Sequence, residues 1–122
     1  MKMLRMIASV MGVIACLSAS VTEADTAFFR TSVDRTLMTG DSKFGGCMAL
    51  LSKTFADVLP ACGNRWVTFS CDGTYTDPVR AYRMLDQAQL ALATGMEVNV
   101  MVDDSKKHNG YCFASRIDVI SP

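Results

Sequence analysis

The chain has 122 residues, and its 12 Lys and Arg side chains balance 12 Asp and Glu side chains, so the formal net charge at pH 7 is zero. This length suits a single domain whose core is near the lower limit for unaided folding. The neutral charge argues against nucleic acid or an anionic membrane surface as the main partner, because both attract proteins with a basic excess.

Residues 1–24 have the features of an export signal peptide. Lys2 and Arg5 give a positive start, and the apolar run that follows is shorter than the roughly 20 residues that a membrane span needs. Thr22-Glu23-Ala24 offers a cleavage site with small residues at both ends. We therefore predict a secreted or periplasmic protein, without a membrane span, whose single domain covers residues 25–122.

A second processing route stays open. Val13-Ile14-Ala15-Cys16 is similar to a bacterial lipobox, in which Cys16 becomes the lipid-anchored first residue. In the other interpretation, Cys16 ends the apolar run and is discarded with the signal. Both routes leave an even number of cysteines, which an exported chain is expected to join as two disulfides. These cysteines are Cys47, Cys62, Cys71 and Cys112.

Strands are expected in the first half of the domain. Polar and apolar side chains alternate from Phe28 to Met38, and dense turn chemistry follows at 39–46. A second, short apolar strand is expected at 47–52. A third is expected at 66–71, where aromatic and β-branched residues gather.

One helix is predicted next. Asp77 is suited to cap it, Pro78 fits the first helical position, and Gly95 is a natural left-handed stop. Apolar residues recur between them at helical spacing: Ala81, Met84, Leu85, Ala88, Ala91 and Leu92.

Two strands are expected after the helix. Alternating valines indicate a half-buried strand at 97–102, and the last strand is expected at 111–120. The residues between them, 103–110, have the composition of a polar loop that ends in the turn pair Asn109-Gly110.

The predicted fold is mainly β with one helix, in the order β-β-β-α-β-β. Among small folds, this order is typical of the OB-fold, a five-stranded, partly open barrel whose helix joins the third and fourth strands. An open α+β sheet with the same order of elements is the alternative. We expect the OB-fold-like barrel.

The expected topology ranks the three pairings that four cysteines allow. Cys47 and Cys71 lie nearly equidistant from the centre of the hairpin of the second and third strands, so they should face each other. The third and fifth strands of such a barrel run parallel and adjacent, which brings Cys62 near Cys112. We predict Cys47–Cys71 and Cys62–Cys112, and the local pair Cys47–Cys62 is the alternative.

No catalytic or metal site is expected. The cysteines lack the close spacing of structural zinc ligands, and the acidic residues form no evident pair. The single histidine, His108, is expected as an exposed residue of a solvated turn with no orienting group. We expect neither a cofactor nor enzymatic activity, and a small hydrolase is the least favoured class.

Strand parity suggests a surface for ligands on the third strand. Trp66, Thr68 and Ser70 alternate with Val67 and Phe69. If Val67 and Phe69 face the core, Trp66 lies outside with hydroxyls beside it, where it can stack on a sugar or contact another subunit. The other interpretation is that Trp66 covers the barrel edge.

Two polar loops are further candidates for ligand binding. In OB-folds the loops after the first strand and between the fourth and fifth strands often carry ligands. Here these loops are 39–46 and 103–110, and they supply Lys43, Lys106 and Asn109. Their composition is compatible with a glycan or protein ligand, and equally with solvated turns.

The second half of the chain, residues 62–120, resembles a known group. With the export signal and disulfides, the helix that ends in Leu92-Ala93-Thr94-Gly95 before Val98-Asn99-Val100 is similar to the B subunits of bacterial AB-type toxins, especially the subtilase-cytotoxin type. It also resembles small secreted proteins of Gram-negative bacteria. The resemblance implies an OB barrel, a homo-oligomer and glycan binding. Cys47–Cys71 is not part of the toxin pattern, and no sugar-binding motif is carried over.

Two hypotheses of function follow. The first is a secreted, non-enzymatic binding module, toxin-B-subunit-like and oligomeric, which recognises a glycan or a protein. The alternative is a periplasmic or outer-membrane lipoprotein or inhibitor with a structural or protective role.

Overall fold

The computed structural model describes residues 25–122 together with Ala15 and Ser18. The predicted signal peptide, its cleavage site and Cys16 lie outside the described residues. Six strands and a helix follow in chain order: β1 (Thr26–Thr31), β2 (Val33–Met38), β3 (Cys47–Leu51), β4 (Trp66–Thr68), α1 (Pro78–Thr94), β5 (Glu97–His108) and β6 (Tyr111–Ile120), with a short 3-10 helix η1 (Pro60–Cys62) before β4.

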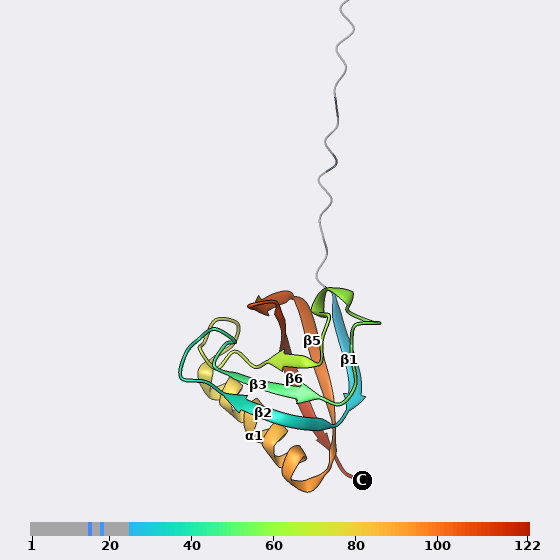
Figure 1. Cartoon of the computed structure of the whole chain (residues 1–122), viewed down its shortest axis with the longest axis vertical. Coiled ribbons are helices and arrows are strands. Elements are labelled where there is room, and N and C mark those ends of the chain that lie inside the picture. Colours follow the sequence, from blue (N-terminus) through green and yellow to red (C-terminus); the bar gives the residue numbers. More distant parts are fainter. Residues whose placement is uncertain (1–14, 16–17, 19–24) are drawn as a thin grey trace, which may run out of the picture.

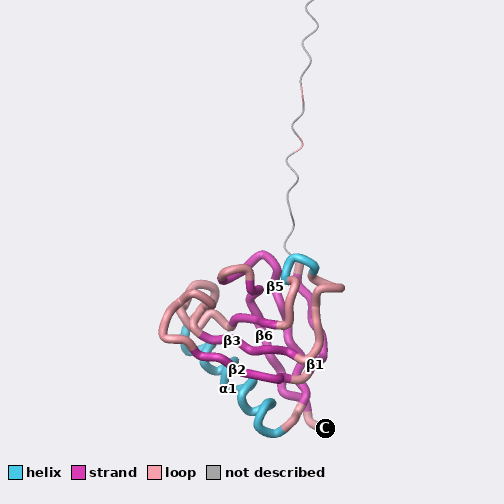
Figure 2. The backbone as a smooth tube through the Cα atoms, in the orientation of Figure 1, coloured by secondary structure: helices cyan, strands magenta, loops and turns pink. Residues whose placement is uncertain are grey.

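The strands form one sheet in the order β1-β5-β6-β4-β3-β2. All neighbours are antiparallel except β4 and β6, which run parallel with Thr68 opposite Phe113. In Figure 1, β2 and β3 cross the direction of β1, β5 and β6, so the sheet is strongly bent. Figure 2 shows α1 at one end of the strands and η1 at the other.

The prediction of one strand from Phe28 to Met38 is wrong. The chain changes partner at Ser32: β1 pairs with β5, whereas β2 pairs with β3. Ser32 lies outside both strands, and its carbonyl accepts a hydrogen bond from the Ser52 amide at 2.9 Å. The structure therefore has six strands where five were expected. The sheet is not closed, because β1 and β2 are its two edges, although they are adjacent in the chain.

The prediction of a loop at 103–110 is also mostly wrong. Strand β5 continues to His108, and only Asn109 and Gly110 form the turn before β6. Both turn residues have positive φ, 51° and 85°, as tight hairpins with an Asn-Gly pair require. The long hairpin of β5 and β6 therefore carries Lys106 and His108 on a strand.

The helix is confirmed. The Asp77 side chain accepts a hydrogen bond from the Val79 amide at 2.9 Å, and Gly95 ends α1 in the left-handed conformation. The buried face of α1 consists mostly of alanine, which lets the helix backbone approach the sheet closely. Its residues are Ala81, Leu85, Ala88 and Ala91. Leu92, expected in this stripe, is 41% exposed. No helix among the described residues is long and apolar enough to cross a membrane.

Both predicted disulfides are confirmed. Cys47–Cys71 joins the start of β3 to the segment after β4, and Cys62–Cys112 joins η1 to β6. Their Cα–Cα distances are 5.7 and 5.5 Å. All four cysteines are buried and belong to the hydrophobic core.

Candidate functional site

An open cleft of about 240 Å³ lies over the outer face of β2, β3 and β4. Strand pairing builds its floor in two rows: Arg35, Leu50 and Trp66 are opposite one another on the three strands, and so are Leu37, Met48 and Thr68. The loop at 39–46 and the start of β6 add the remaining walls. The cleft is lined by Arg35, Leu37, Phe44, Met48, Trp66 and Tyr111.

Aromatic rings dominate the cleft. Phe44 and Tyr111 meet edge to face, with 5.5 Å between their ring centroids. The Arg35 guanidinium carbon lies 5.9 Å from the centroid of Trp66, and Lys43 Nζ lies 5.4 Å from that of Phe44. Such rings offer flat faces to apolar parts of a ligand, and the cations beside them offer hydrogen-bond donors.

The electrostatics of the cleft favour an anion. None of the six lining residues is acidic. Among the described residues, the ion pairs within 4.0 Å do not include Arg35 or Lys43. Arg35 in the cleft lining and Lys43 beside Phe44 are therefore not paired with a carboxylate within 4.0 Å in this part of the chain.

The structure brings together only some of the residues predicted to bind a ligand. Trp66 lines the cleft, and Lys43 lies beside its wall. Lys106 lies on β5 with Nζ 3.9 Å from Asp103, and Asn109 forms the exposed hairpin turn. Neither of these two lines the cleft.

Thr68 is not available to a ligand, which corrects the prediction. It does face the cleft side of the sheet, but the loop at 39–46 covers it, and it is fully buried. Its hydroxyl donates to the Phe44 carbonyl at 2.7 Å. Ser70, expected to be exposed on the same parity, is also fully buried.

Sequence reasoning missed Arg35, Phe44 and Tyr111. Alternation along the predicted strand gives Arg35 the same parity as Val33, but the pairing of β2 and β3 is irregular between Val33 and Arg35. This irregularity puts Val33 in the core while Arg35 is exposed. The available signal for the other two was weak, because each aromatic residue follows turn residues and could be assigned to either face.

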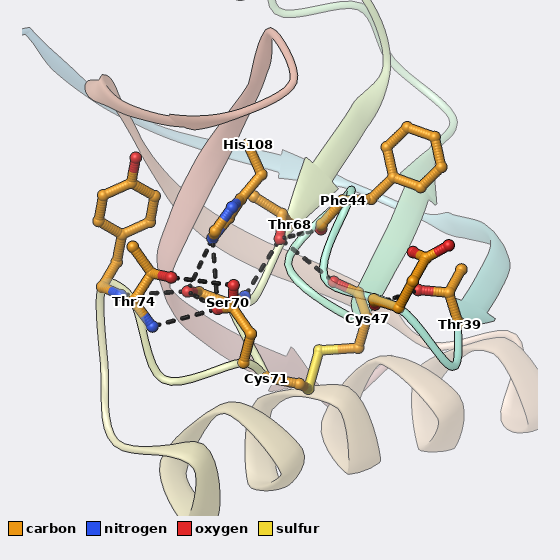
Figure 3. Close-up of a disulfide and its surroundings, with 11 residues drawn as sticks. Thr39, Phe44, Cys47, Thr68, Ser70, Cys71, Thr74 and His108 are labelled. Carbon is orange, nitrogen blue, oxygen red and sulfur yellow. Dashed lines mark hydrogen bonds and ion pairs between the residues drawn. A yellow bond between two sulfur atoms is a disulfide. The ribbon is translucent and has the colours of Figure 1, made fainter.

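A polar cluster around Ser70 and His108 lies against the loop that carries Phe44 (Figure 3). His108 Nε2 is 3.0 Å from Ser70 Oγ and 3.4 Å from Asp72 Oδ1. Ser70 Oγ donates to Asp72 at 2.9 Å and accepts from the Tyr75 amide at 3.1 Å. With its only proton donated to Asp72, the hydroxyl is left to accept from His108, which assigns the proton of a neutral imidazole to Nε2.

The prediction for His108 is therefore wrong. Its side chain is only 10% exposed, and it is oriented by Ser70, Asp72 and the Tyr75 ring, whose centroid is 4.8 Å away. The physical reason is that β5 extends through residue 108, and the segment after β4 covers this end of the strand.

The cluster also fixes the charge of Asp72. Burial is the largest influence and by itself raises the pKa of this carboxyl group. Hydrogen bonds from the Thr74 amide and the Ser70 and Thr74 hydroxyls, together with His108, outweigh it and hold the pKa below 3.8. Asp72 is therefore ionised at neutral pH.

Serine, histidine and aspartate also make up hydrolytic triads, but this geometry differs from them. In a triad the carboxylate holds one imidazole nitrogen and the nucleophile contacts the other. Here Ser70 and Asp72 contact the same nitrogen, and Ser70 is fully buried with a positive φ of 59°. Ser70 cannot reach a substrate in this arrangement. Within residues 25–122, no group of three or more His, Cys, Asp or Glu side chains is arranged to hold a metal ion.

Comparison of the chain with family models, with curated proteins and with solved structures found no match.

Proposed function

We propose that this chain is an exported, non-enzymatic binding module whose ligand is a saccharide seated in the cleft of Trp66, Phe44 and Tyr111. The observation that carries this proposal is the convergence of three aromatic side chains from separate segments on one open cleft. Aromatic faces pack well against the apolar C–H faces of sugar rings, while polar groups at the rim bond their hydroxyls.

Charge narrows the ligand class. The guanidinium of Arg35 offers a planar fork that bonds an anionic oxygen group in two places, and Lys43 adds a second cation at the rim. A saccharide that carries one anionic group fits this surface. A long polyanion fits less well, because its affinity depends on many cationic contacts and the net charge of the chain is zero.

We also infer an OB-type barrel, in which β1 and β2 together act as one bent first strand. The parallel pairing of β4 with β6 and the position of α1 between β4 and β5 support this inference. So does the adjacency of β1 and β2, which are separated by Ser32 alone. In such barrels ligands bind over the second and third strands and the loop after the first. The cleft occupies the corresponding place.

Binding to an array of neutral, carboxylated and sulfated glycans tests the proposal. Trp66→Ala should lower the affinity for the bound glycans at least about tenfold, as expected for a central aromatic contact. Tyr82→Ala is the matched control, since Tyr82 is an exposed aromatic residue on α1 outside the cleft.

Arg35→Met tests how much the acidic group of the ligand contributes to binding, separately from the sugar ring. It should weaken binding of acidic glycans while binding of their neutral counterparts changes little, and Arg80→Met on α1 should change neither. Binding to no glycan, or wild-type affinity in Trp66→Ala, would reject the saccharide. Binding to a glycoprotein that persists after enzymatic deglycosylation would point to a protein ligand instead.

A further inference from the structure

We propose that His108 is a positioning residue for the cleft: held by Ser70 and Asp72, it fixes Phe44 and Tyr111 in the arrangement that receives the ligand. The proposal rests on the proposed function for its effect on binding. The positions of the two rings, however, are a property of the protein without ligand. Figure 3 shows the imidazole pointing into the cluster while the Phe44 ring points away from it.

The first contact is between the imidazole and the loop that carries Phe44. A Cβ added to Gly45 would lie 2.7 Å from His108 Cδ2 and 3.0 Å from Nε2. The backbone of Gly45 therefore rests directly on the ring, at a spacing that leaves no room for a side chain. Because Gly45 follows Phe44 in the chain, the position of the imidazole limits where Phe44 can lie.

The same loop is held from two more points of the segment around β4. Thr68 Oγ1 donates to the Phe44 carbonyl at 2.7 Å, and the Asp72 amide donates to the Gly45 carbonyl at 3.0 Å. The added Cβ on Gly45 would also lie 2.5 Å from Thr68 Oγ1. The residues that surround His108 therefore hold the loop in place through two hydrogen bonds and close packing.

Tyr111, on the other wall of the cleft, is linked to His108 through the hairpin of β5 and β6. His108 is paired with Tyr111 across the turn between β5 and β6. Tyr111 in turn meets Phe44 edge to face at 5.5 Å. His108 therefore contacts the loop of Phe44 with its imidazole and pairs with Tyr111 through its backbone.

The orientation of the imidazole is itself fixed. Ser70 Oγ accepts a hydrogen bond from Nε2 at 3.0 Å, and Asp72 Oδ1 lies 3.4 Å from the same nitrogen. The Tyr75 ring packs against the imidazole, with 4.8 Å between the ring centroids. The Tyr75 hydroxyl donates to the Lys107 carbonyl at 2.6 Å, which ties this segment to the end of β5. A site whose walls are ordered before the ligand arrives loses less freedom on binding. We therefore expect the cluster to raise affinity without touching the ligand.

The glycine pair provides a matched test that leaves His108 in place. Gly45 and Gly46 both have positive φ, 76° and 84°, so alanine strains the backbone at either position. At Gly46, however, the added Cβ meets nothing closer than 3.6 Å, whereas at Gly45 it collides with His108 and Thr68. Gly45→Ala should displace Phe44, and Gly46→Ala should not.

The first readout needs no ligand. Nuclear Overhauser contacts between the rings of Phe44 and Tyr111 should be present in the wild type and in Gly46→Ala, and weakened or lost in Gly45→Ala and His108→Ala. His108→Gln should restore them, because its amide nitrogen can donate to Ser70 as Nε2 does. Unchanged contacts in Gly45→Ala and His108→Ala would overturn the proposal whether or not a glycan binds.

The second readout is affinity for the glycan that the wild type binds most tightly on the array. Gly45→Ala and His108→Ala should lose about fivefold to tenfold, the cost of ordering one or two side chains on binding. Gly46→Ala and His108→Gln should stay within about twofold of the wild type. Each variant is measured at the same number of degrees below its own melting temperature. Equal losses in Gly45→Ala and Gly46→Ala would assign the effect to general destabilisation and reject positioning. If His108→Ala does not fold, the glycine pair still decides between these outcomes.

Discussion

Removing the disulfides one at a time measures how strongly each cross-link stabilises the domain. Cys62–Cys112 spans a sequence separation of 50 residues, and Cys47–Cys71 spans 24. The entropy that a cross-link removes from the unfolded chain grows with the logarithm of loop length. It corresponds to about 4 kcal/mol for the larger loop and about 3.5 kcal/mol for the smaller.

These losses are large for a domain of this size, because small proteins unfold with only about 5–15 kcal/mol. The variants to compare are Cys62→Ala with Cys112→Ala, and Cys47→Ala with Cys71→Ala. All four positions are buried, so alanine adds a small packing loss to both variants and hardly affects their comparison. We expect similar losses, which differ by less than about 1 kcal/mol.

Urea unfolding followed by circular dichroism gives the free energies of unfolding. The urea dependence should become steeper in both variants, because an unfolded chain without a cross-link exposes more surface. A variant that stays within about 1 kcal/mol of the wild type would refute the loop-entropy reasoning for that disulfide. A much greater loss for Cys47–Cys71 than for Cys62–Cys112 would show that native contacts, rather than loop length, set its contribution.

Two further predictions concern single carboxylates. The lowered pKa of Asp72 means that its ionised form stabilises the fold above pH 3.8 and that this contribution is lost as the pH falls through the lower, folded pKa. Urea unfolding between pH 7 and pH 2.5 should therefore show a smaller acid-dependent loss of stability in Asp72→Asn than in the wild type, and parallel curves would contradict this. Asp77→Ala removes the helix cap and should cost about 1 kcal/mol, measured as a lower melting temperature. Asp86→Ala, which breaks only an exposed ion pair with Arg83 at 3.8 Å, is its control and should have little effect; equal losses would refute the capping role.

The elements that the sequence predicted well depend on local signals. Asp77, Pro78 and Gly95 define α1 through capping chemistry that needs no knowledge of the rest of the fold. The disulfide pairing needed only the order of the strands, because a hairpin and one parallel pair bring the cysteines together.

The cleft was less predictable because it depends on register. Trp66 could be placed on the outer face from alternation along its own strand. Arg35 could not, since the irregular pairing near Val33 changes which face the rest of β2 presents. The polar cluster was hidden for a similar reason: His108 looks like a turn residue until the segment of Ser70 and Asp72, far away in the sequence, covers it.

The position of Trp66 has a practical consequence. It is the single tryptophan of the chain, and it lies half-buried in the cleft with a guanidinium over its ring. Its fluorescence therefore comes from one known place, and a ligand that displaces water or Arg35 from the indole should change its emission. The unlabelled protein thus carries its own optical reporter of occupancy, which makes titration of candidate ligands feasible in dilute solution.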